Sequence, residues 1–272
     1  MTGAVRLLLH SLKRSRTLVL TTGLLLAAFQ VVLILVARSM YRSGAFAQLA
    51  NMLPPFVRAL FGPSLVSFMS FSGIVCVAYI EVAVIGALVA ISIALATIPV
   101  SEIETGFIDL ILSRPLARHW IVTRTIVVLA LSVSVLVSMM MAGAWIGLET
   151  LAPRDAPWPS AKLIESLGLN LDLLAISWGG VAMALGSVSR RRRVPSGIAG
   201  LLALTAYLLD YTGRMWKPAE SIAWLSPFRY YTPFDLVMGG PLPVKNLMVL
   251  AGIAATGFAA AYVLFSRRDI SR

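Results

Sequence analysis

Uncharged stretches of about 20 residues recur along this chain, and they constrain its fold more than any other feature. Four of them approach or exceed the roughly 20 residues that an α-helix needs to cross a bilayer. These four runs are 17–37, 82–101, 125–148 and 246–266. Two shorter runs, 173–189 and 194–209, can also span if Asp172 and Asp210 lie at headgroup level. Because backbone amides in hydrocarbon must be satisfied within their own segment, all six runs predict helices.

The composition agrees with lipid as the solvent of this chain. Of its 272 residues 58% are hydrophobic and only 13% are charged, whereas about one quarter of a typical soluble domain is charged. We therefore expect an all-α integral membrane protein with a single transmembrane domain over 1–272. The predicted spans are about 17–37, 79–100, 122–147, 170–189, 194–212 and 245–265.

The segment before the second span is ambiguous. Residues 59–80 carry no charge until Glu81 but are rich in serine, glycine and proline. One helix over 59–101 would be about 64 Å long, twice the hydrocarbon core. We interpret 64–78 as an outer re-entrant or interfacial segment and 79–100 as the second span. A seventh span is the alternative.

The basic residues predict the orientation. Fourteen of the 23 fall in short segments that six spans place on the side of the N-terminus. They are Arg6, Lys13, Arg14, Arg16, Arg114, Arg118, Arg124, Arg190 to Arg193, Arg267, Arg268 and Arg272. The positive-inside rule therefore predicts a multi-pass protein of the cytoplasmic membrane with both termini in the cytoplasm. The net charge of +11 then reflects topology and contact with anionic lipid, and we expect no nucleic-acid partner.

An amphipathic segment precedes the first span. Over 4–16 its apolar and basic residues fall on opposite faces at helical spacing, with Leu8 and Leu12 on one and His10 and Arg14 on the other. This pattern predicts an interfacial helix lying flat on the inner membrane surface.

Residues with catalytic or metal-binding potential are sparse. The chain has two histidines and one cysteine, and no glycine-rich loop followed by lysine that could cradle the phosphates of ATP. We expect neither catalysis nor a metal or cofactor in this chain. Glu81 is the intramembrane charge that could line a cavity or pair with Arg58, and it would be the key residue of an ion-coupled secondary transporter, the alternative function.

The densest cluster of mixed charge reads SEIETGFIDLILSRPLAR, from Ser101 to Arg118. Ser101 and Glu104 have the spacing of a capping box, and acids in a first turn complement the helix dipole. Ile103, Phe107, Leu110 and Ile111 repeat at helical spacing, and Pro115 ends the pattern. The sequence predicts a short amphipathic helix over 101–113 on the cytoplasmic side. Acids there oppose the positive-inside preference, so we expect a cytoplasmic partner to use them.

This motif, E-x-E-x-G-x-x-D-L-x-L-S-R-P-L-x-R, resembles the permease subunits of type-2 ABC exporters, which are six-helix membrane proteins driven by a separate ATPase. The ending FSRRDI, from Phe265 to Ile270, and the outer segment MLPPFVRALFG resemble the same family. The resemblance covers the whole chain in length, span number and motif order. The chain departs from the family pattern between Ile103 and Phe107, which bears on which ATPase is matched.

The resemblance implies a role for each matched residue. The helix 101–113 would be a coupling helix that docks into a groove of an ATP-binding-cassette ATPase. Glu102, Glu104 and Asp109 would meet basic groups, Phe107 and Leu110 would fill an apolar pocket, Gly106 would permit close approach, and Pro115 with Arg118 would set the exit into the third span. Arg267, Arg268 and Asp269 would add a second inner contact. Two permease subunits, the second a copy or a homologue, would work with two ATPases that bind ATP and Mg²⁺.

Overall fold

The computed structural model describes residues 3–46, 48, 69–105 and 119–267. All regular elements in these ranges are helical, and six segments are long and apolar enough to cross a membrane. They are Leu8–Arg42, Phe71–Ala96, His119–Leu151, Ala161–Val188, Arg193–Met215 and Val244–Arg267. Within these ranges the prediction of an all-helical protein with six segments able to span a membrane is confirmed, and no seventh such segment is present there.

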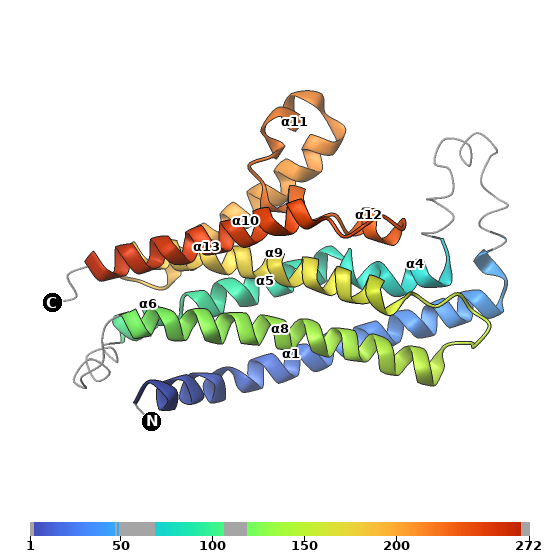
Figure 1. Cartoon of the computed structure of the whole chain (residues 1–272), viewed down its shortest axis with the longest axis horizontal. Coiled ribbons are helices and arrows are strands. Elements are labelled where there is room, and N and C mark those ends of the chain that lie inside the picture. Colours follow the sequence, from blue (N-terminus) through green and yellow to red (C-terminus); the bar gives the residue numbers. More distant parts are fainter. Residues whose placement is uncertain (1–2, 47, 49–68, 106–118, 268–272) are drawn as a thin grey trace.

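Most of the spans run side by side along the long axis of the molecule (Figure 1). These are α1 (Gly3–Arg42), α8 (His119–Leu151), α9 (Ala161–Val188) and α13 (Val244–Arg267), together with a second span built from α4 (Phe71–Cys76), the 3-10 turn η1 (Val77–Tyr79) and α5 (Val82–Ala96). The short α6 (Ile98–Glu104) follows α5. The fifth span, α10 (Arg193–Met215), leads away from the bundle to α11 (Lys217–Ala223).

The two ends of the bundle differ in what they carry. The N-terminus of α1, the helix α6 and the C-terminus of α13 lie at one end, which we call the α6 end (Figure 1). The opposite end, where α4 begins, is the α4 end. Three short elements separate α10 from α13: α11, η2 (Pro227–Tyr230) and α12 (Pro233–Val237).

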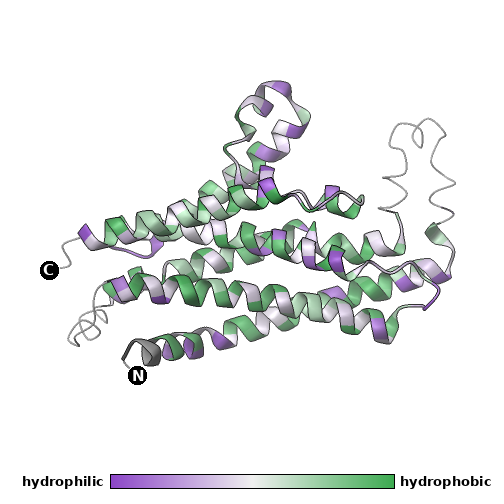
Figure 2. Cartoon of the chain, in the orientation of Figure 1, coloured by the Kyte–Doolittle hydropathy of each residue, from purple (hydrophilic) through white to green (hydrophobic). Residues whose placement is uncertain are grey.

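Apolar residues cover the outside of the bundle as well as its inside. Green, hydrophobic residues dominate the middle of the helices, and purple, hydrophilic residues gather towards their ends (Figure 2). Leu24, Leu25 and Leu201 are each more than 60% exposed. A contiguous apolar surface of this extent is unsuited to water, whereas lipid tails solvate it well. The chain is a multi-span helical membrane protein.

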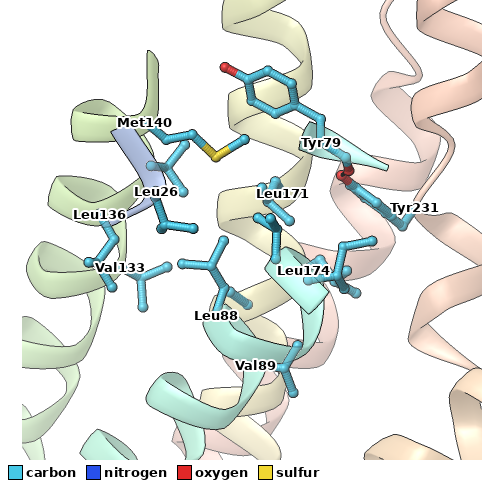
Figure 3. Packing of buried hydrophobic residues seen from close by; sticks show 14 of the residues in the cluster. Leu26, Tyr79, Leu88, Val89, Val133, Leu136, Met140, Leu171, Leu174 and Tyr231 are labelled. Atoms are coloured by element: carbon cyan, nitrogen blue, oxygen red, sulfur yellow. Dashed lines mark hydrogen bonds between the residues drawn. The ribbon is translucent and has the colours of Figure 1, made fainter. Parts of the chain in front are cut away.

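The interior is filled by close side-chain packing. Leu26 of α1, Leu88 of α5 and Leu136 of α8 are buried and point towards one another, and Leu171 and Leu174 of α9 complete the layer (Figure 3). Between helices in a bilayer the stabilisation comes from dispersion contacts and small-residue approach, because lipid tails are as apolar as leucine.

Glycines allow two helix pairs to approach closely. A Cβ atom built on Gly143 of α8 would lie 2.6 Å from the Cα atom of Ala27 in α1. One built on Gly180 of α9 would lie 2.8 Å from the carbonyl oxygen of Ala254 in α13, and Gly257 contacts the Gly180 backbone from the other side. The pairs α1–α8 and α9–α13 therefore meet backbone to backbone.

The N-terminal segment differs from the prediction. We expected a separate interfacial helix over 4–16, but α1 is continuous from Gly3 to Arg42. No glycine or proline stands between residues 4 and 22, so nothing in the chain ends the helix before the apolar run begins. With 40 residues, α1 is about 60 Å long, roughly twice the hydrocarbon core.

The second span begins earlier than predicted. Ser70 caps α4, its hydroxyl oxygen accepting a hydrogen bond from the Gly73 amide at 3.1 Å. Residues 71–79 then continue towards α5 within one candidate span, interrupted only around Ile80 and Glu81. We expected a re-entrant or interfacial segment over 64–78, but residues 71–78 belong to the second span. Residues 64–68 lie outside the described residues. Serines and a glycine lowered the apparent lipophilicity of this half, but Gly73 is buried and Ser70 and Ser72 are half-buried.

The fourth span is also longer than its uncharged run. We expected it over 170–189 with Asp172 near its outer end, but α9 starts at Ala161. Asp172 thus lies about three turns inside the helix. Its carboxylate accepts a hydrogen bond from the Ser134 hydroxyl of α8 at 2.9 Å, and this partner lowers the cost of a polar group at that depth.

Candidate functional site at the α6 end

The candidate site is the elbow between α5 and α6. The span ends at Ala96, and the Thr97 hydroxyl donates to the carbonyl oxygens of Ile93 and Ala94 at 3.0 and 3.2 Å. The next helix starts at Ile98, with Pro99 in its first turn. Proline is favoured there because its missing N–H and fixed φ suit a helix start. We had expected Ser101 to cap the new helix, but the N-cap of α6 is Thr97, four residues earlier.

A buried ion pair joins α6 to α8. The Glu102 carboxylate accepts a hydrogen bond from the Arg124 guanidinium at 2.5 Å, and the two side chains are only 6% and 7% exposed. Taking both charges out of water is costly, so each depends on the other for compensation. The pair therefore holds α6 against α8 in one geometry.

A second contact joins α6 and α5 to the loop between α9 and α10 (residues 189–192). The Arg192 amide donates to the Glu104 carboxylate at 3.0 Å. Its guanidinium donates to the carbonyl oxygen of Ala94 at 3.1 Å and to the Thr97 hydroxyl at 3.5 Å. Arg192 thus spans the elbow, binding the end of α5 and the end of α6 at once.

The two contacts together connect four elements at this end of the bundle. They are α5, α6, α8 and the 189–192 loop, and the linking residues are Glu102, Glu104, Arg124 and Arg192. We call these four residues the elbow network. Any displacement of α6 acts directly on α8, and through the loop on the start of α10.

The structure locates part of the predicted coupling site. Glu102 is buried and paired within the chain, whereas Glu104 is exposed. Gly106, Phe107, Asp109, Leu110, Pro115 and Arg118 lie outside the described residues, as do Arg268 and Asp269. Arg267 is the exposed last residue of α13, at the same end as α6.

Sequence reasoning missed two members of the elbow network. Arg124 and Arg192 were counted only as topology signals, because each belongs to a basic segment. The signal that could have found them is the pair of acids at 102 and 104, which a positive-inside surface does not favour. Such acids need partners, and the nearest arginines at neighbouring helix ends are the first candidates.

Glu81, the other predicted residue, lies at the interruption of the second span. It precedes α5 with extended backbone geometry, is half-buried, and its carboxylate makes no hydrogen bond or ion pair within the described ranges. Arg58, its suggested partner, lies outside them. Val82, the next residue, borders an apolar groove of about 230 Å³ between α5 and α10.

That groove is lined almost wholly by carbon. Its walls come from Ile85 and Val89 of α5 and Leu204 and Tyr207 of α10, and Phe228 also lines it. Phe228 packs edge to face on Tyr207 at 5.5 Å. If a Cβ atom were added to Gly86, Gly197 or Gly200 on these two helices, no other atom would lie within 4 Å of it. This face therefore has room for another helix.

No group of three or more histidine, cysteine or acidic side chains comes together in the part of the chain that the structure describes. The donor sets that hold Zn²⁺ or Ca²⁺ are accordingly not assembled within these ranges.

Comparison with known proteins found no match for this chain. No protein-family model matches it. No curated protein matches it either.

Proposed function

We propose that this chain is the membrane subunit of an ATP-binding-cassette exporter, moving a substrate with energy from ATP hydrolysed by a separate ATPase. The single observation that supports this most is the elbow network, because it ties a short helix at one bundle end to the spans α5 and α8 and to the loop before α10. A subunit without ATPase motifs needs such a contact network, because the conformational change of a separate ATPase must be transmitted to its spans.

Glu102 and Glu104 have different roles in this proposal. Glu102 is committed to Arg124, so we assign it to transmission within the chain rather than to the ATPase contact that the resemblance implies. Glu104 is exposed and can face a basic group of the ATPase beside its bond to Arg192. The residues from Gly106 to Arg118 complete the docking surface in this proposal, and Arg267 to Asp269 add a second contact.

The face between α5 and α10 is our choice for the second permease subunit. Six spans in one bundle leave no enclosed path for a substrate, whereas two apolar grooves facing each other create one. The open glycine positions and the largely exposed α10 suit a partner helix. We propose that the α6 end faces the cytoplasm, since it carries the greater share of basic residues.

The proposal is tested by purifying the tagged chain from its own membranes in mild detergent. Mass spectrometry should find a stoichiometric subunit with a phosphate-binding loop, and the eluate should hydrolyse ATP. The Glu104→Lys, Gly106→Trp double variant should lose substrate-stimulated hydrolysis while it still inserts. Lys13→Ala, a charge change on α1 outside the elbow network, is the matched control. A chain that elutes alone and inert towards ATP, yet intact, contradicts the proposal.

A secondary transporter is the second candidate, and one observation favours it. The second span is interrupted at Ile80 and Glu81, and broken helices with a carboxylate at the break line ion sites in such transporters. In that case Glu81→Gln should abolish uptake driven by a proton or sodium gradient in vesicles without ATP. Gradient-independent transport that needs ATP excludes this candidate.

A further inference from the structure

A pocket of about 170 Å³ lies beside the elbow network at the α6 end. The lining residues come from α1, from the α5–α6 elbow, from α8 and from the 189–192 loop. They are His10, Ser11, Arg14, Ser15, Leu18, Ala94, Leu95, Ile98, Ser101, Glu102, Arg124 and Arg192. A cavity of about 150 Å³ is known to hold a molecule of benzene size, so this pocket has room for a phosphate-sized group.

The charges that line the pocket are unbalanced. Three guanidinium groups, from Arg14, Arg124 and Arg192, face one carboxylate, that of Glu102. Arg124 is neutralised by its ion pair, which leaves two positive charges without an acidic partner among the lining residues. Guanidinium groups bind phosphate oxygens through charge-assisted hydrogen bonds, and bidentate geometry makes them stronger than lysine contacts.

Arg14 is the free member of the set. It makes no hydrogen bond or ion pair with the described part of the chain, and its side chain is exposed at the pocket. Arg192 uses its Nε and one Nη2 contact for Thr97 and Ala94, and a guanidinium has five N–H donors. Donors therefore remain on both arginines for an anion between them, and His10 one turn before Arg14 adds a further polar group.

One wall of the pocket is apolar. Leu18 lies one turn beyond Arg14 on α1, and Ala94, Leu95 and Ile98 face it from the elbow. A charged site that continues directly into an apolar wall fits a molecule with an anionic head and a hydrocarbon tail. Basic pockets between helix ends on the cytoplasmic side bind lipid headgroups in this way.

We propose that this pocket binds a phosphate group through Arg14 and Arg192, supplied by the headgroup of an anionic phospholipid or by free phosphate. The apolar wall favours the lipid source. This site is separate from the transport function proposed above, since it needs neither an ATPase nor a cargo, and binding can be measured on the chain alone.

The test is native mass spectrometry of the full chain in detergent, titrated with dioleoyl-phosphatidylglycerol, with dioleoyl-phosphatidylcholine for comparison. Arg14→Ala should weaken phosphatidylglycerol binding by about tenfold, because one charge-assisted contact is lost. Arg16→Ala is the matched control: it removes the same charge two residues away, outside the pocket lining, and should bind as the unaltered chain does. Thermal unfolding verifies that both variants remain folded.

Two further measurements identify the source of the phosphate. If the lipid is the ligand, Leu18→Asn should also weaken phosphatidylglycerol binding, and millimolar inorganic phosphate should not compete. If free phosphate is the ligand, inorganic phosphate should raise the unfolding temperature of the unaltered chain but not of Arg14→Ala, and Leu18→Asn should behave as the unaltered chain. Equal lipid binding by Arg14→Ala and Arg16→Ala, with no effect of phosphate on either, overturns the proposal.

Discussion

At the scale of single residues, the Glu102–Arg124 pair shows how a charged side chain is tolerated when it is buried between helices. Its two side chains are almost fully removed from solvent, and each one alone would be an uncompensated buried charge. One oxygen of the Asp172 carboxylate accepts a hydrogen bond from the Ser134 hydroxyl. The Gln30 side-chain amide donates to the carbonyl oxygen of Val75 at 2.9 Å. These three contacts each connect two helices.

Removing one member of the ion pair should therefore cost more than removing both. We expect Arg124→Leu or Glu102→Leu alone to lower the free energy of unfolding by about 3–5 kcal/mol. The Glu102→Leu, Arg124→Leu double variant should recover most of that loss, because two apolar side chains leave no orphan charge. Unfolding in mixed micelles with increasing dodecyl sulfate measures all three. A double variant no more stable than the worse single one would show that the pair is not coupled.

At the scale of elements, the helix α13 depends on the small residues that face α9. A Cβ at Gly257 would collide with the backbone of Gly180, whereas a Cβ at Gly252, on the same helix, would meet nothing within 4 Å. Within a bilayer such close approach is what replaces the hydrophobic driving force of a water-soluble core.

This contrast predicts opposite effects of the same substitution. Gly257→Ala should separate the two helices and destabilise the bundle by about 1–3 kcal/mol, the usual cost of overpacking. Gly252→Ala should stabilise it by about 0.5–1 kcal/mol, since alanine loses less conformational entropy in a helix than glycine does. Thermal unfolding midpoints in one detergent compare the two variants directly, and a loss of stability in both would argue against the close approach of α9 and α13.

The elements also show what the sequence could and could not predict. The centres of the six spans were predictable, because long uncharged runs admit only a helix in lipid. Their ends were not: Asp172 marked the end of an uncharged run but lies inside α9, where a serine on a neighbouring helix donates to one of its carboxylate oxygens. Ser101 was interpreted as the cap of a new helix, although α6 already begins at Ile98. Arg124 and Arg192 could be assigned to the elbow only when the helices around them were placed.

At the scale of the whole molecule, the arrangement of the two ends decides how the protein sits in its membrane. The start of α1, the helix α6 and the end of α13 share one end (Figure 1), as six spans require. The arginine-rich loop between α9 and α10 belongs to that end through Arg192, whereas the loop between α8 and α9, with Arg154, lies at the other end.

The orientation can be tested with thiol chemistry, because Cys76 is the chain's single cysteine and is buried. In a Cys76→Ser background we expect Arg154→Cys to react with a membrane-impermeant maleimide in intact cells. Arg190→Cys should react only after the membrane is opened. Both positions are exposed, so access to the reagent and not burial determines the result. The reverse pattern would place the α6 end outside and contradict the topology.

The uninterrupted α1 gives the molecule a mechanical property. At one end of this helix Arg14 and His10 line the basic pocket, and at the other the Tyr41 hydroxyl donates to the carboxylate and backbone oxygens of Asp155 at 3.2 and 3.0 Å. Because α1 is one uninterrupted helix, its two ends change position together when it tilts. A ligand that changed the angle of α1 at the pocket would therefore also act on the Tyr41–Asp155 contact at the opposite end of the bundle.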